Sequence, residues 1–307
     1  MNANYFELQL KINPLMEDII SEIFFDNFDC EGVVLAEETY KDLEMVATTE
    51  GTLKIFIRAE GQDSYEDLKY DIENILDLSR EEFLSRGLSE EELGSWDFVL
   101  EEKKTEDWSQ KWKEKWDVTH VTDKIAVVPD WIEYEPKEGE VVIKLEPGCA
   151  FGTGTHQTTQ LCMKAIEKYL KAGDRVADIG MGSGILSILA KKFGASYVYG
   201  CDNDDTVIDV ARENALKNNV ECTFELGTAD KVEEKFDFIC ANILHFVLAE
   251  IMGDLKNLMK TGALMSLSGI LDEKRDMVIE AYKREGLELI EEIVQDQWTS
   301  FVVKRVD

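Results

Sequence analysis

Histidines and closely spaced cysteines are scarce in this chain of 307 residues. Its three histidines and six cysteines are scattered, and no C-x-x-C pair occurs. Zinc sites and disulfide-rich secreted domains both need such residues at close, regular spacings. We therefore predict no metal site and no disulfide scaffold.

Long apolar runs are also missing. No stretch approaches the roughly 18 apolar residues that a membrane-spanning helix needs. The first residues, MNANYFELQLK, lack the basic region followed by an apolar run that marks a signal peptide. We therefore expect a cytoplasmic protein in a reducing compartment, without a membrane partner.

Positive charge is in short supply. Lysine and arginine total 33 against 64 acidic residues, which gives a formal net charge of −31. Nucleic-acid affinity is built largely from basic groups that neutralise phosphates, so this balance argues against a direct nucleic-acid reader and favours a basic partner. Residues 1–102 hold 27 acidic and 7 basic side chains, so the first third of the chain carries most of the imbalance.

Residues 1–102 show the pattern of a small α+β domain. Apolar and polar residues alternate over 5–12, as in a half-buried strand, and a helical pattern follows. Further strands are expected at 33–35, 53–57 and 96–100, with a helix between the last two. The order β-α-β-β-α-β is typical of a ferredoxin-like domain, a fold that by itself specifies no function.

Residues 103–120 are expected to form a linker helix. Trp108, Trp112 and Trp116 recur every four residues, which places three indoles on one helix face. They could form a substrate platform or pack the linker against a domain, and large aromatic side chains more often serve burial.

Residues 121–307 alternate strands and helices. This alternation predicts an α/β domain with a doubly wound, mostly parallel sheet whose ligands bind at the carboxyl ends of the strands. The last two strands, 287–294 and 300–304, have no helix between them, so we expect an antiparallel hairpin at one edge.

The strongest chemical signal is the segment RVADIGMGSG, residues 175–184. A predicted strand ends here in a turn that contains Gly180, Gly182 and Gly184, and glycine allows a tight turn and close approach to a ligand. Asp202 ends the next predicted strand, where a carboxylate can accept hydrogen bonds from both ribose hydroxyls. Together these features predict a pocket for a nucleoside cofactor.

The spacing of the glycines favours one cofactor class. A dinucleotide site has glycine or alanine at the third position of G-x-G-x-x-G/A, where this chain has Ile185. G-x-G-x-G after a strand that ends in aspartate is instead the S-adenosylmethionine pattern. A glycine-rich turn with only a structural role is the alternative.

Two further segments support this interpretation. Asn242 follows the predicted strand FDFICA, where its side-chain oxygen could hold an amine beside a sulfonium methyl group, although such an asparagine can also be only a turn former. Residues 146–159, EPGCAFGTGTHQTT, form a loop rich in glycine and threonine that could close over a cofactor or merely cap the next helix.

Several segments closely resemble the PrmA family, the methyltransferases of ribosomal protein eleven of the large subunit. The resemblance covers nearly the whole chain, and its most specific string is the F-G-T-G-T-H-x-T-T of the loop. The segments that carry it are EPGCAFGTGTHQTTQLC (146–162), VADIGMGSGILSILA (176–190), ANIL (241–244), SLSGIL (266–271) and DWSQKW (107–112).

The resemblance implies a class I methyltransferase domain with a seven-stranded Rossmann-like sheet, preceded by a ferredoxin-like substrate-recognition domain. The donor would be S-adenosylmethionine, and the acceptors would be lysine side-chain and N-terminal amines. Carried over by motif, the cofactor contacts are Thr159, Gly180, Gly182, Asp202, Asn242, Phe151 and Thr155.

Two positions depart from the family. Met181 stands where cysteine is common, and His245-Phe246-Val247 replaces small residues and proline near the target-amine side. Asn242 is expected to orient a neutral amine, and His156 or His245 could accept its proton. Another basic protein or a small amine as substrate, a nucleic-acid base, and a non-catalytic cofactor-binding module are the alternatives. A nucleic-acid base is opposed by the net charge and by the sequence Asn-Ile-Leu-His in place of Asn-Pro-Pro-aromatic.

Overall fold

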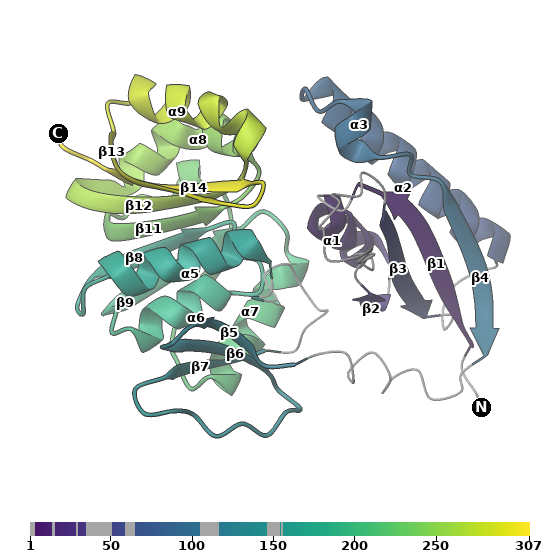
Figure 1. Cartoon of the computed structure of the whole chain (residues 1–307), viewed down its shortest axis with the longest axis horizontal. Helices are drawn as coiled ribbons and strands as arrows, with labels where there is room; N and C mark the ends of the chain where they lie inside the picture. Colours follow the sequence, from purple (N-terminus) through teal and green to yellow (C-terminus); the bar gives the residue numbers. More distant parts are fainter. Residues whose placement is uncertain are drawn as a thin grey trace, which may run out of the picture. The chain divides into compact units, whose positions relative to one another are not determined.

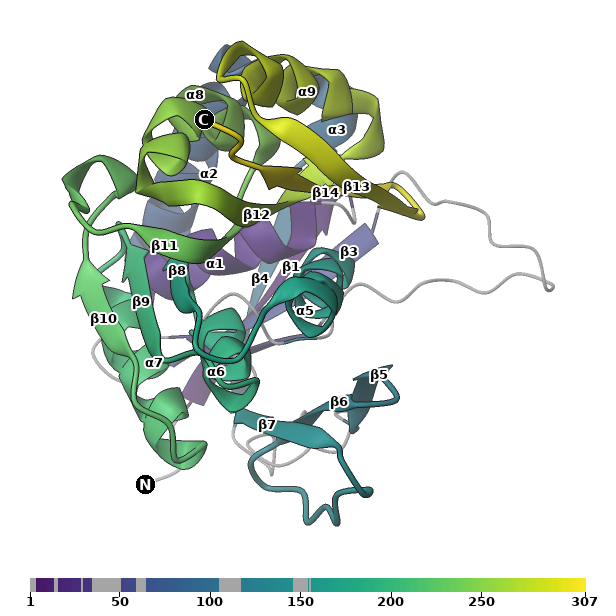
Figure 2. The same cartoon turned by 90° about the vertical axis from the view of Figure 1, so that its left-hand side faces the viewer.

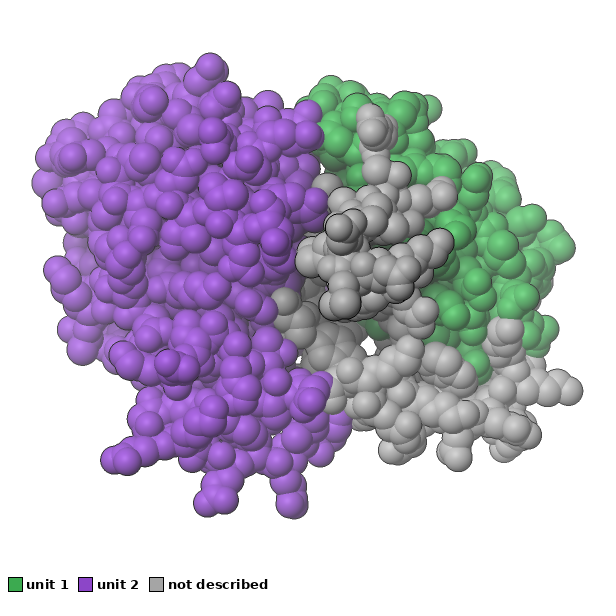
Figure 3. Space-filling model, viewed as in Figure 1, with its two compact units in different colours: residues 1–116 green, residues 117–307 purple. Residues whose placement is uncertain are grey.

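The structure is a computed structural model that describes residues 4–13, 16–28, 30–34, 51–58, 65–104, 117–145, 154 and 156–307. The chain divides into two compact units, residues 1–116 and 117–307 (Figure 3). Each unit contains its own main sheet.

Unit 1 contains a four-stranded sheet of order β2-β3-β1-β4 (Figure 1). β1 pairs antiparallel with β3 and β4, and β2 pairs antiparallel with β3. This is the ferredoxin-like arrangement that the sequence predicts. The elements are β1 (Asn4–Ile12), α1 (Glu17–Asn27), β2 (Cys30–Val34), β3 (Gly51–Arg58), α2 (Tyr65–Ser85), α3 (Glu90–Leu93) and β4 (Phe98–Lys104).

Regular apolar spacing builds the core of unit 1. Leu8, Leu10 and Ile12 alternate along β1 and are fully buried, as the period of a strand requires. Leu68 and Ile72 are buried one turn apart on α2. Glutamate and aspartate occupy most of the exposed face of the same helix.

The expected linker helix over 103–120 is wrong at both ends. β4 continues to Lys104, which pairs with Asn4, and β5 begins at Thr119, which pairs with Val127. Ladder hydrogen bonds to a neighbouring strand fix the extended conformation there, whatever the helical spacing of the tryptophans. Residues 105–116, including Trp108, Trp112 and Trp116, lie outside the described residues.

Unit 2 contains a seven-stranded sheet of order β10-β9-β8-β11-β12-β14-β13 (Figure 2). β8 to β12 are parallel, and β14 runs antiparallel to both β12 and β13. The predicted doubly wound sheet and its edge hairpin are therefore confirmed. The strands are β8 (Arg175–Ile179), β9 (Tyr197–Asp202), β10 (Thr223–Leu226), β11 (Phe236–Asn242), β12 (Met259–Leu271), β13 (Glu288–Gln295) and β14 (Trp298–Lys304).

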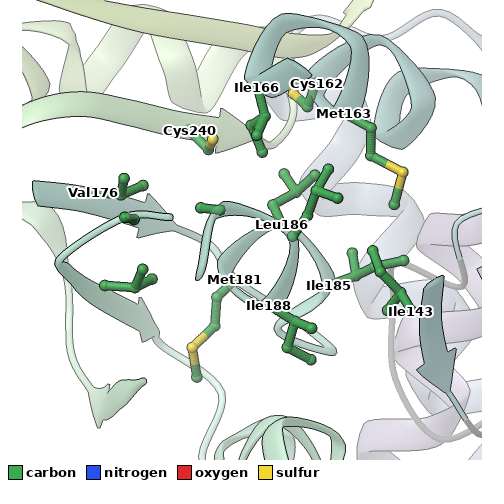
Figure 4. Packing of buried hydrophobic residues seen from close by; sticks show 14 of the residues in the cluster. Ile143, Cys162, Met163, Ile166, Val176, Met181, Ile185, Leu186, Ile188 and Cys240 are labelled. Carbon is green, nitrogen blue, oxygen red and sulfur yellow. The ribbon is translucent and has the colours of Figure 1, made fainter. Parts of the chain in front are cut away.

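Helices enclose two apolar clusters, one for each face of this sheet. Neighbouring strand residues divide between the clusters, as Val176 and Ala177 do on β8, because successive side chains point to opposite faces. α5, α6 and α7 contribute to the first cluster, and α8 and α9 to the second. Figure 4 shows Cys162 of α5 and Leu186 of α6 within the first cluster. The helices are α5 (Gln157–Tyr169), α6 (Ile185–Lys192), α7 (Thr206–Lys217), α8 (His245–Leu258) and α9 (Arg275–Arg284), with short 3-10 turns η3 (Ala229–Lys231) and η4 (Asp272–Lys274).

A second, three-stranded sheet precedes the large one in unit 2. It contains β5 (Thr119–Thr122), β6 (Ile125–Pro129) and β7 (Val141–Leu145) in that order. Asn218, at the end of α7, holds β7 by two hydrogen bonds to the Lys144 backbone: its Oδ1 accepts from the N–H at 2.9 Å and its Nδ2 donates to the carbonyl at 2.6 Å. Among the described helices, none is long and apolar enough to cross a membrane.

Gly200 on β9 leaves space for the side chain of Met181, one of the two positions that depart from the family pattern. A Cβ at Gly200 would lie 2.6 Å from Met181 Sδ and 2.8 Å from Phe224 Cδ1. Both distances are shorter than van der Waals contact, so we expect Gly200→Ala to lower the free energy of unfolding by about 1–3 kcal/mol. Shortening the clashing side chain with Met181→Cys should recover part of the loss. Urea denaturation measures both effects.

The matched control for this substitution is Gly227→Ala. Nothing lies within 4 Å of a Cβ at Gly227, so this change should leave the free energy of unfolding within about 0.5 kcal/mol of the parent. Equal losses at Gly200 and Gly227 would mean that the packing against Met181 is not what requires glycine.

Candidate active site

The turn from β8 into α6 depends on its glycines. Gly180, Gly182 and Gly184 have φ of 71°, 49° and 76°, a region that residues with a Cβ rarely adopt. Gly180 N–H and Met181 N–H both donate to the Cys201 carbonyl, at 2.9 and 3.2 Å. The turn therefore lies flat against the carboxyl end of β9.

Asp202, the last residue of β9, accepts a hydrogen bond from the same turn. Its Oδ2 accepts from Gly182 N–H at 2.9 Å, and its Oδ1 accepts from Asp204 N–H at 3.2 Å. The side chain is buried, which raises the pKa of its carboxyl group, and the N–H donors oppose that rise. The carboxylate predicted to bind a ribose thus also holds the glycine loop in place.

Asp178 lies beneath the loop and is fully buried. Its Oδ2 accepts from Ser187 N–H at 2.9 Å and from Ser187 Oγ at 2.8 Å, which ties the end of β8 to α6. Burial raises the pKa of Asp178 to about 7, against the lowering effect of these two donors, and the charge of Asp202 adds to the rise. Sequence reasoning missed Ser187, although it is the one polar residue in the apolar run ILSILA.

Asn242 and Thr159 meet across 83 residues of sequence. Asn242, the last residue of β11, donates from Nδ2 to Thr159 Oγ1 at 3.3 Å, and both side chains are buried. Asn242 Oδ1 is also buried and has no hydrogen-bond partner among the described residues. A buried acceptor without a partner costs free energy, which favours a donor from a ligand at this position.

Ile243, which follows Asn242, lies between Gly180 and Gly269. A Cβ at Gly180 would lie 2.3 Å from Ile243 Cγ2, and a Cβ at Gly269 would lie 2.4 Å from the Ile243 carbonyl oxygen. Gly269 has a φ of 83° and lies where the pairing of β12 with β14 shifts register. The glycine loop and β12 can therefore both approach the chain beside Asn242.

The two histidines expected near the site have different surroundings. His156 is the N-cap of α5, where its Nδ1 accepts from Thr158 N–H at 3.3 Å and lies 2.7 Å from Thr158 Oγ1. His245 is the first residue of α8, is 4 % exposed and makes an edge contact with Phe246. His156 thus stabilises the start of α5.

Five of the seven predicted cofactor residues lie in one region, at the carboxyl ends of β8, β9 and β11. Gly182 bonds Asp202, Asn242 bonds Thr159, and Gly180 contacts the residue after Asn242. Phe151 and Thr155 lie outside the described residues. Within the described part of the chain, no group of three or more histidine, cysteine or acidic residues could hold a metal ion.

The large sheet has seven strands, of which β14 runs antiparallel to its two neighbours. With a glycine turn after β8, an acid at the end of β9 and a buried asparagine at the end of β11, it defines a class I methyltransferase, a class of enzymes that use S-adenosylmethionine. The model of the family described as "Ribosomal protein L11 methyltransferase (PrmA)" matches residues 4–306. The chain belongs to this family, as the sequence resemblance predicts.

Individual relatives agree with the family assignment. A protein of Caldicellulosiruptor saccharolyticus named ribosomal protein L11 methyltransferase is 36% identical over 312 residues, covering 98% of this chain and 99% of the relative. One of the same name from Dictyoglomus turgidum is 34% identical over 310 residues, covering 99% of each chain. The crystal structure of ribosomal protein L11 methylase from Lactobacillus delbrueckii subsp. bulgaricus is similar with a TM-score of 0.60 and 32% identity, covering 62% of this chain and 100% of that one.

Asp178 should make the stability of the protein depend on pH. Its pKa rises from 3.8 to about 7 on folding, so between these values the folded state binds a proton that the unfolded state has lost. The favourable contribution of Asp178 protonation to the free energy of unfolding is complete below pH 3.8. It is lost as pH rises through about 7, and it amounts in total to roughly 4 kcal/mol. Asp178→Asn keeps an oxygen acceptor for Ser187 and removes the titration.

The measurement for Asp178 is the free energy of unfolding of parent and variant from pH 4 to pH 8. Their difference should move in favour of Asp178→Asn as pH rises, because only the parent must bury a charge. A difference that stays constant across this range would show that Asp178 ionises alike in the folded and unfolded states.

Proposed function

We propose that this chain transfers methyl groups from S-adenosylmethionine to lysine side-chain amines and the N-terminal amine of ribosomal protein L11. The observation that carries the proposal is the Asn242 amide, fixed by Thr159 beside the glycine loop, with a buried oxygen that has no partner among the described residues. Membership of the family and the names of its relatives supply the substrate. A ribosomal protein as substrate points to the cytoplasm.

The residues at the strand ends fit S-adenosylmethionine. The loop of Gly180 and Gly182 exposes backbone without a Cβ, and Asp202 offers a carboxylate to ribose hydroxyls. Thr159 and Asn242 would lie toward the reacting end, and the resemblance adds Phe151 and Thr155. The bound donor supplies a methyl group on a sulfonium, which reacts by in-line displacement.

The protein contributes orientation of the amine. A lysine amine has an unperturbed pKa of about 10.4 and must lose its proton before its lone pair can attack. Asn242 Oδ1 is a neutral acceptor in a buried position, so it can take a hydrogen bond from a neutral amine and point its lone pair at the methyl group. We infer no dedicated strong base in this reaction.

The histidines contribute little to proton removal in this scheme. The cap interaction of His156 occupies its Nδ1 at the start of α5. His245 stands where the family commonly has small residues, so we assign it to the wall of the amine site. The proton would then leave with solvent.

We propose that the acidic amino-terminal domain, residues 1–102, recognises the basic substrate, with 103–120 as the linker and 121–307 as the methyltransferase domain. Acidic residues make up most of the exposed face of α2, including Asp71, Asp77 and Glu81. Charge complementarity of this kind raises association rates and weakens with salt.

The test of the function is the intact mass of purified ribosomal protein L11 after incubation with this protein and S-adenosylmethionine. We expect increments of one methyl group. Unchanged mass, with S-adenosylmethionine binding shown by calorimetry, would discard this substrate and leave another basic protein or a small amine. Tight binding without turnover on any amine would indicate a non-catalytic module.

Two variants separate the roles of the site residues in the same assay. Asp202→Ala should abolish methylation through loss of S-adenosylmethionine affinity, because it removes both the ribose acceptor and the bond to Gly182. Asn242→Ala should lower kcat by about 100-fold and change cofactor affinity far less, because it removes the amine acceptor and the bond to Thr159 but leaves Asp202 and the glycine loop in place. Equal turnover of Asn242→Ala and parent would contradict its assigned role.

The acidic amino-terminal domain predicts that kcat/KM for ribosomal protein L11 depends on salt concentration. Replacing Asp71, Asp77 and Glu81 with Asn, Asn and Gln removes three exposed charges from α2. We expect kcat/KM for ribosomal protein L11 to fall by about tenfold at low ionic strength and the difference from the parent to shrink as salt is added, since surface charges are screened.

The matched control removes three exposed acids from unit 2. Glu213, Glu221 and Glu233, each replaced by Gln, change the net charge by the same amount. If both triple variants lose the same kcat/KM, net charge alone accounts for the effect and α2 is not the recognition surface.

A further inference from the structure

The segment SLSGIL on β12 contains a buried serine next to the proposed amine site. Ser268 is fully buried and is the neighbour of Asn242 in the parallel pairing of β12 with β11. Its Oγ donates to the Thr158 carbonyl at 3.0 Å, across 110 residues of sequence. The serine thus joins β12 to the first turn of α5.

This bond closes a ring of four residues. Ser268 holds the Thr158 carbonyl, Thr158 is bonded through the chain to Thr159, Thr159 accepts from Asn242, and Asn242 pairs with Ser268 in the sheet. All four side chains are at least nine-tenths buried. The ring connects α5, β11 and β12 at the point where Asn242 Oδ1 is left without a described partner.

Ser268 is a second attachment for the first turn of α5, in addition to the cap by His156. α5 begins at Gln157, so Thr158 and Thr159 have no preceding helical turn to hold them. The terminal torsion of an asparagine amide is broad, so the direction of Oδ1 depends on what holds Nδ2. If the first turn shifts, Thr159 moves and the Asn242 amide can rotate.

We propose that Ser268 is a positioning residue, which fixes Thr159 through the Thr158 carbonyl and so directs Asn242 Oδ1 at the amine. The inference rests on the proposed function for its kinetic consequence. The ring itself does not depend on that function, because it is a property of the folded chain without substrate.

The first test observes the Asn242 side-chain amide by nitrogen–proton correlation NMR of the full chain, with the signals assigned by their absence in Asn242→Ala. We expect Ser268→Ala to shift these signals and speed their exchange with water. The control is Ser266→Ala, because Ser266 is equally buried two residues earlier on β12, and its hydroxyl donates to Cys162 Sγ outside the ring. Ser266→Ala should leave the Asn242 signals in place.

The second test measures methylation kinetics of the same variants. Ser268→Ala should lower kcat by about 10- to 100-fold, with S-adenosylmethionine affinity near that of the parent, whereas Ser266→Ala should keep the parental kcat. Because Ser268 acts through Asn242, Ser268→Ala should add no further loss in the Asn242→Ala background. Ser268→Cys, of similar volume with a weak donor, repeats the comparison if Ser268→Ala does not fold.

Two outcomes would overturn the inference. One is an Asn242 amide that responds alike to Ser268→Ala and Ser266→Ala. The other is a loss of kcat from Ser268→Ala that persists undiminished in the Asn242→Ala background. Failure of the proposed function would look different, because the parent itself would then methylate no ribosomal protein L11 while the NMR comparison kept its full meaning.

Discussion

The glycine turn after β8 lies against the end of β9, and the rest of the site depends on that contact. Backbone N–H groups of the turn donate to the Cys201 carbonyl and the Asp202 carboxylate, which requires positive φ at Gly180 and Gly182. The same turn contacts Ile243, so it also limits where β11 can end. One backbone conformation therefore sets the position of the predicted ribose acceptor and of Asn242.

Buried polar groups surround this turn, and most of them are satisfied within the protein. At the ends of β8 and β11, the Asp178 Oδ1 and Asn242 Oδ1 atoms are buried without a hydrogen-bond partner among the described residues, and their chemistry differs. Asp178 can take up a proton, because burial raises its pKa to about 7. The Asn242 amide does not take up a proton at any ordinary pH, so only a hydrogen-bond donor can satisfy its oxygen.

Rigid support for the amide comes from three elements that are distant in sequence. α5 supplies Thr159, β12 supplies Ser268 and Gly269, and the glycine turn supplies Gly180. In the proposed reaction, the rate depends on holding an amine in line with the methyl group, so small displacements of Asn242 would lower it.

The sequence by itself determined most of the element order, the doubly wound sheet, the glycine turn and the positions of Asp202 and Asn242 at strand ends, because each is encoded in local periodicity or in a short motif. It did not reveal α3 or β5. It could not reveal that Thr159 bonds Asn242 across 83 residues, or that Ser268 bonds Thr158 across 110. It also misassigned the ends of 103–120, where Lys104 pairs with Asn4 of β1 and Thr119 pairs with Val127 of β6. Tertiary structure decided these points because hydrogen bonds between distant segments depend on register and on helix placement, and neither leaves a pattern in neighbouring residues.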